Sequence, residues 1–212
     1  EMSDSVFMDC PLLAAAGKLT GDSRYFAACL NHLRHMESLC LRQDGIYRHS
    51  PLSEAAWGRG NGFPALGLSL VLSYIPEDAP ERAEILTSHQ KHLAALTKHH
   101  STGMWRQVID DSRSYREFSS TCMITFAMLR GMRMGWLDRE TYEPVADKAW
   151  AAIKLRISMD GRDLVDVCTG TGKQKSLEAY FRRKAILGRD DRGGAMALMV
   201  ATERAMWEQA FE

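Results

Sequence analysis

Hydrophobic residues recur at spacings of three and four along most of the chain, which is typical of amphipathic helices. The first such segment runs from Asp4 to Ala16 and is followed by Gly17, a common helix stop signal. A second begins after Thr20-Gly21-Asp22-Ser23 and continues to about Gln43. Together they predict a helical hairpin.

The same design repeats along the chain, with one helix apolar on nearly every face and the next apolar on one side only. The predicted apolar helices are Gly62 to Ile75, Glu117 to Met134 and Gly194 to Trp207, and the amphipathic ones are Glu81 to His99 and Arg139 to Ile157. Asp163 to Cys168 is the one strand candidate, and it reads equally well as the edge of a loop. The pattern therefore predicts an all-α protein of inner helices wrapped by outer ones, as in an α-solenoid or an α/α toroid.

The connections between the predicted helices differ in length. Those that follow an inner helix are short, whereas residues 44–56, 101–116 and 158–191 follow outer helices and are long. Long loops that carry aromatic and charged residues are often functional. All three return from an outer helix to an inner one, so we expect them to gather on one face and to form the site there.

Composition limits the class of partner. The 212 residues fit a single domain spanning 1–212, and 27 basic residues balance 27 acidic ones, so we expect no nucleic-acid partner. Every apolar run is interrupted by charge or glycine, so we expect no membrane-spanning helix.

The five cysteines are widely spaced without a CxxC pair, which indicates neither a disulfide framework nor a zinc site and favours a reducing, cytoplasmic location. The chain enters a helical pattern at once, which suggests that it starts inside a domain.

Three glycines stand beside two aromatic residues and an arginine in Trp57-Gly58-Arg59-Gly60-Asn61-Gly62-Phe63. Glycine permits close approach of a backbone or a ligand, so this stretch favours a binding corner over a helix interior. The alternative is a turn in which Trp57 and Arg59 pack on each other. No strand precedes the stretch, which excludes a dinucleotide fingerprint, and Gly170-Thr171-Gly172-Lys173 fails as a P-loop for a similar reason.

Histidines at a spacing of three lie on two predicted outer helices. The pairs are His32 with His35 and His89 with His92. Because outer helices expose one face, we expect solvated side chains there and not metal ligands. No metal or cofactor is expected elsewhere.

Several motifs, in order along the chain, resemble those of the unsaturated glucuronyl and rhamnogalacturonyl hydrolases, glycoside hydrolase families 88 and 105. They are Asp4 to Leu13, Trp57 to Phe63, Gly103 to Asp110, Tyr115 to Ser119, Cys168 to Gly172, Tyr180 to Arg183 and Gly193 to Glu203. The resemblance implies a six-hairpin α/α barrel whose first hairpins are missing from this chain. It also implies a small oligosaccharide substrate that ends in a 4,5-unsaturated uronic acid, and hydration of that double bond in place of direct glycosidic displacement.

The same resemblance implies individual roles. Asp4 matches the catalytic aspartate that protonates C4 and activates water, although on chemistry alone Asp4 reads as a helix cap. His49 matches a histidine near the uronate, Arg59 would face a carboxylate or hydroxyl, and Trp57 would stack on a sugar ring. The predicted substrate-binding residues are His49, Trp57, Arg59, Asn61, Phe63, Met8, Trp105, Thr169 and Thr171.

Three departures from the family pattern affect the rim of the predicted site. Phe63 stands where the family more often has Trp, which keeps a stacking surface and removes an N–H donor. Phe181 and Arg192 replace a frequent Tyr and His. Glu117 reads either as a pocket wall or as a helix-start carboxylate, and we favour the structural role.

Two other functions remain open at the level of sequence. A non-catalytic carbohydrate-binding or scaffolding fragment would share these motifs and, with inner helices exposed, would self-associate as a homo-oligomer. A lyase or another toroid glycosidase would act on saturated polymer. The form of the Trp57 motif favours the rhamnogalacturonyl branch.

Overall fold

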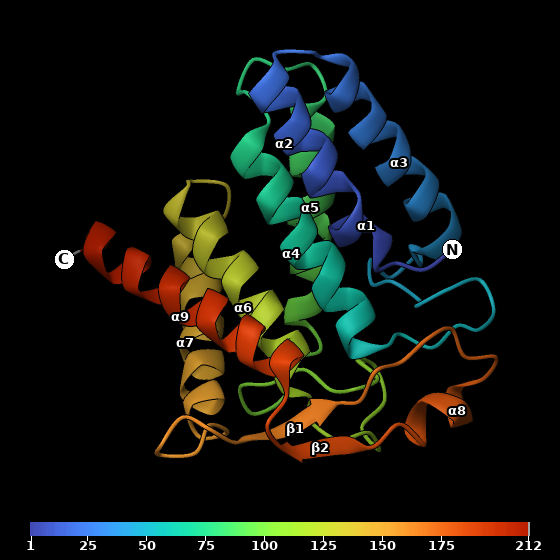
Figure 1. Ribbon diagram of the computed structural model, residues 1–212, viewed down its shortest axis with the longest axis vertical. Coiled ribbons are helices and arrows are strands. Elements are labelled where there is room, and N and C mark those ends of the chain that lie inside the picture. The colour runs from blue at the N-terminus through green and yellow to red at the C-terminus, as the bar shows by residue number, and fades with distance from the viewer. Residues whose placement is uncertain (212) are drawn as a thin grey trace.

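A computed structural model of the protein describes residues 1–211 and is predominantly helical (Figure 1). The helices are α1 (Ser5–Met8), α2 (Cys10–Thr20), α3 (Arg24–Cys40), α4 (Gly58–Tyr74), α5 (Arg82–Thr97), α6 (Phe118–Arg133), α7 (Arg139–Lys154), α8 (Leu177–Phe181) and α9 (Asp191–Phe211). Two strands, β1 (Leu164–Cys168) and β2 (Ala185–Gly188), form a two-stranded antiparallel sheet. All seven predicted helices are present, with boundaries shifted by a few residues, and the first of them is divided into α1 and α2.

From α3 to α7 the helices alternate between outer and inner positions as the pattern of apolar residues predicts, whereas α9, which was predicted to be apolar on nearly every face, buries only Gly193, Val200, Glu203 and Trp207. Nearly every residue of α4 and α6 is buried, whereas α3, α5 and α7 bury one side only. Helix α6 packs against both α4 and α9, and α2 packs against α3 and α4. Among the helices of residues 1–211, none is both long and apolar enough to span a membrane.

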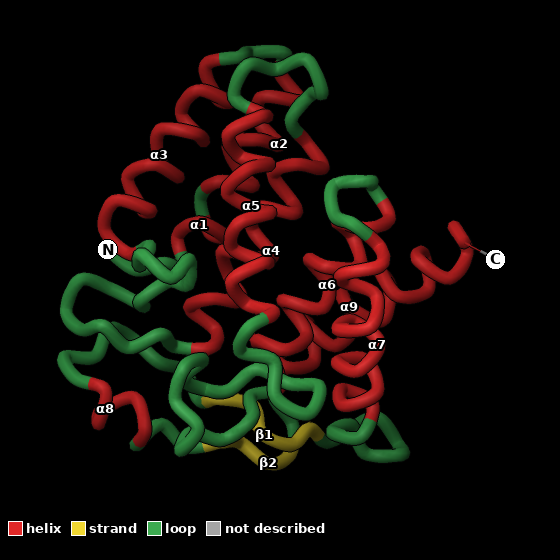
Figure 2. The backbone as a smooth tube through the Cα atoms, turned by 180° about the vertical axis from the view of Figure 1, so that it is seen from behind, coloured by secondary structure: helices red, strands yellow, loops and turns green. Residues whose placement is uncertain are grey.

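The three long connections gather at one end of the molecule, as predicted, while the short turns lie at the other end (Figure 2). Backbone hydrogen bonds join them: Gly58 N donates to Gln107 O at 2.7 Å and Ile109 N donates to Ala56 O at 2.8 Å. The Gln107 side chain donates to the carbonyl of Tyr180 in the third loop at 2.9 Å. This end of the protein is therefore a continuous platform made by segments far apart in the sequence.

The glycine-rich stretch is helical, because α4 begins at Gly58 and includes all of its glycines. A Cβ on Gly58 would lie 2.4 Å from the carbonyl oxygen of Arg106, so glycine is needed where the second long loop crosses the helix start. A Cβ on Gly67 would lie 2.7 Å from the carbonyl oxygen of Val6 and 2.8 Å from Phe7 Cα. Absence of side chains thus lets a loop and α1 lie directly on α4.

Other local predictions need correction. Helix α2 continues through the buried Gly17 to Thr20 and ends at Gly21, whose φ of 73° is the left-handed conformation that glycine adopts easily. The strand candidate near Asp163 is a real strand, paired with β2, which the sequence pattern did not indicate. The outer-helix histidines His89 and His92 are buried, not solvated.

Candidate functional site

Asp4 and His49 meet at the edge of the loop platform. Asp4 directly precedes α1, and its side chain makes no capping hydrogen bond, so the alternative of a simple helix cap is not supported. Its Oδ1 atom lies 3.1 Å from Nε2 of His49. Asp4 Oδ1 and His49 Nε2 are both buried and have no aligned hydrogen-bond partner within residues 1–211. A close but misaligned pair of this kind is common when a catalytic site holds no substrate.

The imidazole of His49 is fully buried and held from several directions. Its backbone N–H donates to Ala55 O at 3.1 Å, and its carbonyl accepts from Ser3 N at 2.9 Å, which ties the first loop to the residues just before Asp4. The Trp57 ring lies 4.4 Å from the imidazole between centroids. On the side opposite Nε2, Nδ1 is 2.7 Å from the hydroxyl of Tyr180.

Tyr180 was not among the predicted site residues. It lies on α8 and is fully buried, and burial raises the pKa of its hydroxyl, which keeps the proton in place. The sequence signal was present in Tyr180-Phe181-Arg182-Arg183, but only the fold brings this residue to His49. Ser3, whose hydroxyl donates to Gly60 O at 2.7 Å, was also missed.

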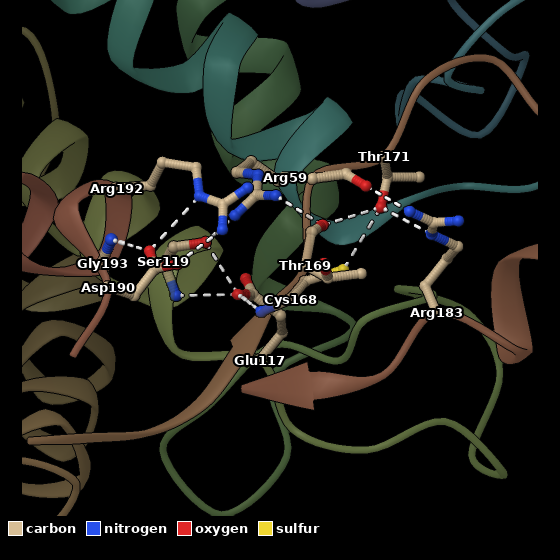
Figure 3. A network of polar contacts seen from close by, with 11 residues as sticks. Arg59, Glu117, Ser119, Cys168, Thr169, Thr171, Arg183, Asp190, Arg192 and Gly193 are labelled. Atoms are coloured by element: carbon tan, nitrogen blue, oxygen red, sulfur yellow. Dashed lines mark hydrogen bonds and ion pairs between the residues drawn. The ribbon is translucent and has the colours of Figure 1, made fainter. Parts of the chain in front are cut away.

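Arg59 lies at the centre of a second polar cluster, beside the start of α6 (Figure 3). Arg59 is 3% exposed, and its guanidinium donates to Ser119 Oγ at 3.1 Å and to Thr169 O at 3.0 Å. It also stacks 5.0 Å from the centroid of Trp57. The side chain is thus strongly held by protein, and the packing of Trp57 on Arg59 that the sequence left open as an alternative is present.

Glu117 supports the Arg59 cluster through Ser119. It is fully buried and caps α6 by accepting from Ser119 N at 3.1 Å and Ser120 N at 2.6 Å. Its Oε1 also accepts from Ser119 Oγ at 2.7 Å and from Cys168 N at 2.8 Å. The favoured prediction of a helix-start carboxylate is therefore confirmed, and the residue further connects α6 to β1.

Two predicted substrate contacts are core residues in the structure. Trp105 is fully buried, and its indole N–H donates to Leu96 O at 2.8 Å. Asn61 is fully buried as well, and its side chain bonds to the backbone of Tyr47 and Trp57. Because neither side chain has free surface or free hydrogen-bonding capacity, we correct both to structural roles.

The other predicted contacts differ in exposure. Trp57 is 1% exposed, with His49 and Arg59 against its ring, whereas Met8 on α1 is 48% exposed. Phe63 is partly buried and stacks on Phe7 at 5.4 Å between centroids. Of these side chains, Met8 and Phe63 retain surface that a sugar ring can contact.

Thr169 and Thr171 lie beside Arg59, on the partly exposed loop after β1 (Figure 3). Thr171 Oγ1 donates to Thr169 O at 2.9 Å, and Arg183 Nε donates to Thr171 Oγ1 at 3.3 Å. Arg192, one of the departures from the family pattern, forms an ion pair with Asp190 at 2.5 Å. The charge of Arg192 is therefore neutralised by Asp190 within the C-terminal part of the site, close to Arg59.

A cavity of about 470 Å³ lies nearby in the platform but contains none of the predicted residues. It is lined by Arg42, Glu54, Ala55, Asp110, Asp111 and Leu177. Arg42 is already paired with Asp44 at 2.6 Å and with Asp110 at 2.8 Å. The chemistry of the Asp4 cluster, and not the size of this cavity, therefore defines the candidate site.

The described residues 1–211 contain no group of three or more His, Cys, Asp or Glu side chains that could hold a metal ion.

Comparison with known proteins agrees with this picture. The model of Glycosyl Hydrolase Family 88 matches residues 3–208, so the chain belongs to that family. It is 29% identical over 175 residues to an unsaturated 3S-rhamnoglycuronyl hydrolase of Alteromonas sp. (strain LOR), covering 76% of this chain and 42% of the relative. It is 32% identical over 187 residues to the unsaturated rhamnogalacturonyl hydrolase YesR of Bacillus subtilis, covering 84% of this chain and 52% of the relative.

A solved structure shows the same architecture over the whole chain. A possible member of the GH105 family from Salmonella enterica serovar Paratyphi A superposes with a TM-score of 0.88 at 26% identity, covering 100% of this chain and 57% of that one. The predicted all-α class of the α/α toroid type is therefore confirmed. The chain spans about half the length of the curated relatives it matches.

Proposed function

We propose that this chain carries the catalytic residues of a glycosidase that removes a terminal 4,5-unsaturated uronic acid from short oligosaccharides produced by polysaccharide lyases. The observation that carries the proposal is the contact of 3.1 Å between Asp4 Oδ1 and His49 Nε2, in which both atoms are buried without an aligned partner among the described residues. Buried polar atoms normally have hydrogen-bond partners. A pair without them is therefore expected where a substrate or a reacting water supplies the hydrogen bonds.

The reaction that we propose is hydration of a vinyl ether. Asp4 in its acid form gives a proton to C4, which forms a C–H bond and leaves positive charge shared by C5 and the ring oxygen. Water then adds at C5 and returns a proton to the Asp4 carboxylate. The resulting hemiketal opens, and the remaining sugar leaves from C1 as that carbon becomes an aldehyde. The two-carboxylate geometry of ordinary glycosidases is not required, because the glycosidic oxygen is not displaced directly.

The neighbours of Asp4 have consistent roles in this scheme. The imidazole of His49 directs Nε2 toward the carboxylate, and the 14% exposure of the Asp4 side chain leaves access from solvent. Phe63 lies near the start of α4 and Met8 is the last residue of α1, and their partly exposed faces would hold a sugar ring against apolar surface. Arg59 would set the shape of the site through Ser119 and Thr169.

We further propose an unsaturated galacturonyl-rhamnose unit as the substrate type. The Trp-Gly-Arg-Gly-Asn-Gly form of residues 57–62 supports it, and so does the name of the relative from Bacillus subtilis. The name of the Alteromonas relative points instead to an unsaturated 3S-rhamnoglycuronyl unit. Both substrates combine an unsaturated uronic acid with rhamnose, so they are the first pair to compare.

The test follows the ultraviolet absorbance of the double bond. The chain and its Asp4→Asn variant are incubated with each unsaturated disaccharide, after a thermal melt has shown that both fold. We expect the absorbance to decay only with the unmodified chain, since asparagine keeps the size of aspartate and cannot transfer a proton. Decay of the absorbance at the same rate with Asp4→Asn would contradict the proposal. Binding of either disaccharide by calorimetry without decay would favour a carbohydrate-binding role, and a rise in absorbance on saturated polymer would indicate a lyase.

A further inference from the structure

We infer that the hydroxyl of Tyr180 is a positioning group that holds His49 in the tautomer with hydrogen on Nε2, so that this N–H faces Asp4. The inference deepens the proposed function, on which its catalytic meaning rests. Its structural content concerns only the location of a proton on His49, and it is tested separately.

The first step is the direction of hydrogen bonding at Tyr180. Among the described residues, the hydroxyl makes hydrogen bonds with Gln174 N at 3.3 Å and with His49 Nδ1 at 2.7 Å, and a side-chain hydrogen bond from Ser53 lowers the pKa of Tyr180. A backbone N–H can only donate, so the tyrosine oxygen accepts from Gln174. Ser53 acts as a donor toward the tyrosine oxygen, since a hydrogen bond that lowers the pKa of Tyr180 stabilises its charged form, and Nδ1 of His49 is therefore the acceptor to which the tyrosine proton is directed.

The second step is the other side of the ring. When Nδ1 accepts a hydrogen bond, a neutral imidazole carries its hydrogen on Nε2. This atom lies 3.1 Å from Asp4 Oδ1, an acceptor when ionised. The opposite tautomer would place a lone pair of Nε2 against a carboxylate oxygen. Tyr180 and Asp4 therefore favour the same location for the proton, although they contact opposite sides of the imidazole.

The third step is the rigidity of Tyr180. Its ring is fully buried and packs with Ala55, Trp57, Val108 and Cys168. Its carbonyl accepts from the Gln107 side chain at 2.9 Å, which binds α8 to the second long loop. The neighbouring Phe181 ring lies 4.9 Å from the guanidinium of Arg113 in that loop. The hydroxyl is thus fixed by contacts that do not involve His49, which a positioning group requires.

The consequence for catalysis is a defined proton arrangement at the site. An N–H that faces Asp4 stabilises the carboxylate after it has given its proton to C4. If the ring turned over or changed tautomer, the carboxylate would lose this donor. A residue that orients a catalytic group through one hydrogen bond contributes on the order of ten-fold in rate.

The test combines nuclear magnetic resonance with the variant Tyr180→Phe, which keeps the ring and removes the hydroxyl. The full chain is labelled with ¹⁵N-histidine, and the signals of His49 are assigned by their loss in His49→Gln. Two-bond ¹H–¹⁵N spectra then report which ring nitrogen carries hydrogen. We expect the Nε2–H form in the unmodified chain and a mixture of tautomers in Tyr180→Phe. Tyr142→Phe removes the hydroxyl of a largely buried tyrosine in the first turn of α7 and should leave the signature unchanged.

Two results would overturn the inference. One is an Nδ1–H or doubly protonated His49 in the unmodified chain at neutral pH, and the other is an unchanged Nε2–H signature in Tyr180→Phe. Turnover gives the second readout: we expect kcat to fall about ten-fold in Tyr180→Phe while KM changes little. If Asp4→Asn retains turnover but the tautomer shifts as described, the proposed function fails and the structural inference stands.

Discussion

Oε1 of Glu117 accepts a hydrogen bond of 2.8 Å from the backbone N–H of Cys168, so that the cap of an inner helix also anchors the strand that follows the last outer helix. The same oxygen accepts from Ser119 N and Ser119 Oγ, and Oε2 accepts from Ser120 N. A single buried carboxylate thereby joins α6, β1 and, through Ser119, the guanidinium of Arg59.

We predict that Glu117→Gln lowers the free energy of unfolding by about 2–3 kcal/mol, because an amide nitrogen would face backbone donors and leave at least one of them unsatisfied. Urea unfolding measures the change. The matched control is Asp138→Asn, which makes the same chemical change at the exposed cap of α7, where we expect less than about 1 kcal/mol. Equal effects at both positions would contradict the role assigned to burial.

The position of Asp4 depends on the close contact between α1 and α4. We predict that Gly67→Ala costs about 1–3 kcal/mol, since its Cβ would meet the backbone of Val6 and Phe7, which cannot move aside like a flexible side chain. Turnover should fall as well, because α1 carries Asp4 toward His49. Thermal unfolding and the absorbance assay measure the two effects.

Gly194→Ala is the control for this glycine, because nothing lies within 4 Å of its added Cβ in α9. There we expect a gain of up to about 1 kcal/mol from helix propensity. A neutral Gly67→Ala would show that α1 tolerates displacement from α4.

Sequence periodicity predicted the inner and outer helices from α3 to α7, because the spacing of apolar residues determines which helix faces can be buried. It overestimated the burial of α9, which is apolar in composition but buries only four residues. It did not predict the role of Gly58, since the contact that requires glycine is the carbonyl of Arg106 in another loop. It missed β2, whose four residues become a strand only by pairing with β1.

The sequence predicted some residues of the candidate site correctly and gave others a wrong role. Family motifs identified Asp4 and His49, which the fold brings together. The same motifs contain side chains that bind ligands and side chains that support the backbone, and sequence position alone did not separate them. Trp105 and Asn61 belong to the second kind, as their hydrogen bonds to Leu96, Tyr47 and Trp57 show.

Arg59 allows a test that separates a structural role from contact with substrate. We predict that Arg59→Lys lowers the free energy of unfolding by about 1.5–3 kcal/mol, because an ammonium cannot reach Ser119 Oγ and Thr169 O together in the planar geometry of a guanidinium. Urea unfolding and steady-state kinetics are measured on the same preparations. Arg183→Lys, at a more exposed position of the same cluster, is the control and should cost less. Unchanged stability with a raised KM would show that Arg59 acts mainly on the substrate.

Acid sensitivity of the fold should come in part from His89. Burial lowers the pKa of His89 to about 3, with a smaller contribution from the neighbouring His92, and both ring nitrogens lack partners within the described residues. The unfolded chain takes up a proton near the ordinary pKa of 6.5, whereas the folded chain remains neutral at this residue. Stability is therefore unaffected above that pH and decreases as the pH falls from about 6.5 toward 3.

We expect His89→Leu to remove this contribution, so that the variant loses about 1 kcal/mol less stability than the unmodified chain between about pH 7 and pH 5.5. Some acid sensitivity should remain, because burial also lowers the pKa of His92, against the opposing effect of its hydrogen bonds to Gly45 and Asn61. Urea unfolding at the two pH values measures the difference. His35→Leu makes the same change at an exposed position of α3 and should leave the pH dependence as it is. Parallel loss of stability in His89→Leu and the unmodified chain would mean that other groups, and not this buried imidazole, set the response to acid.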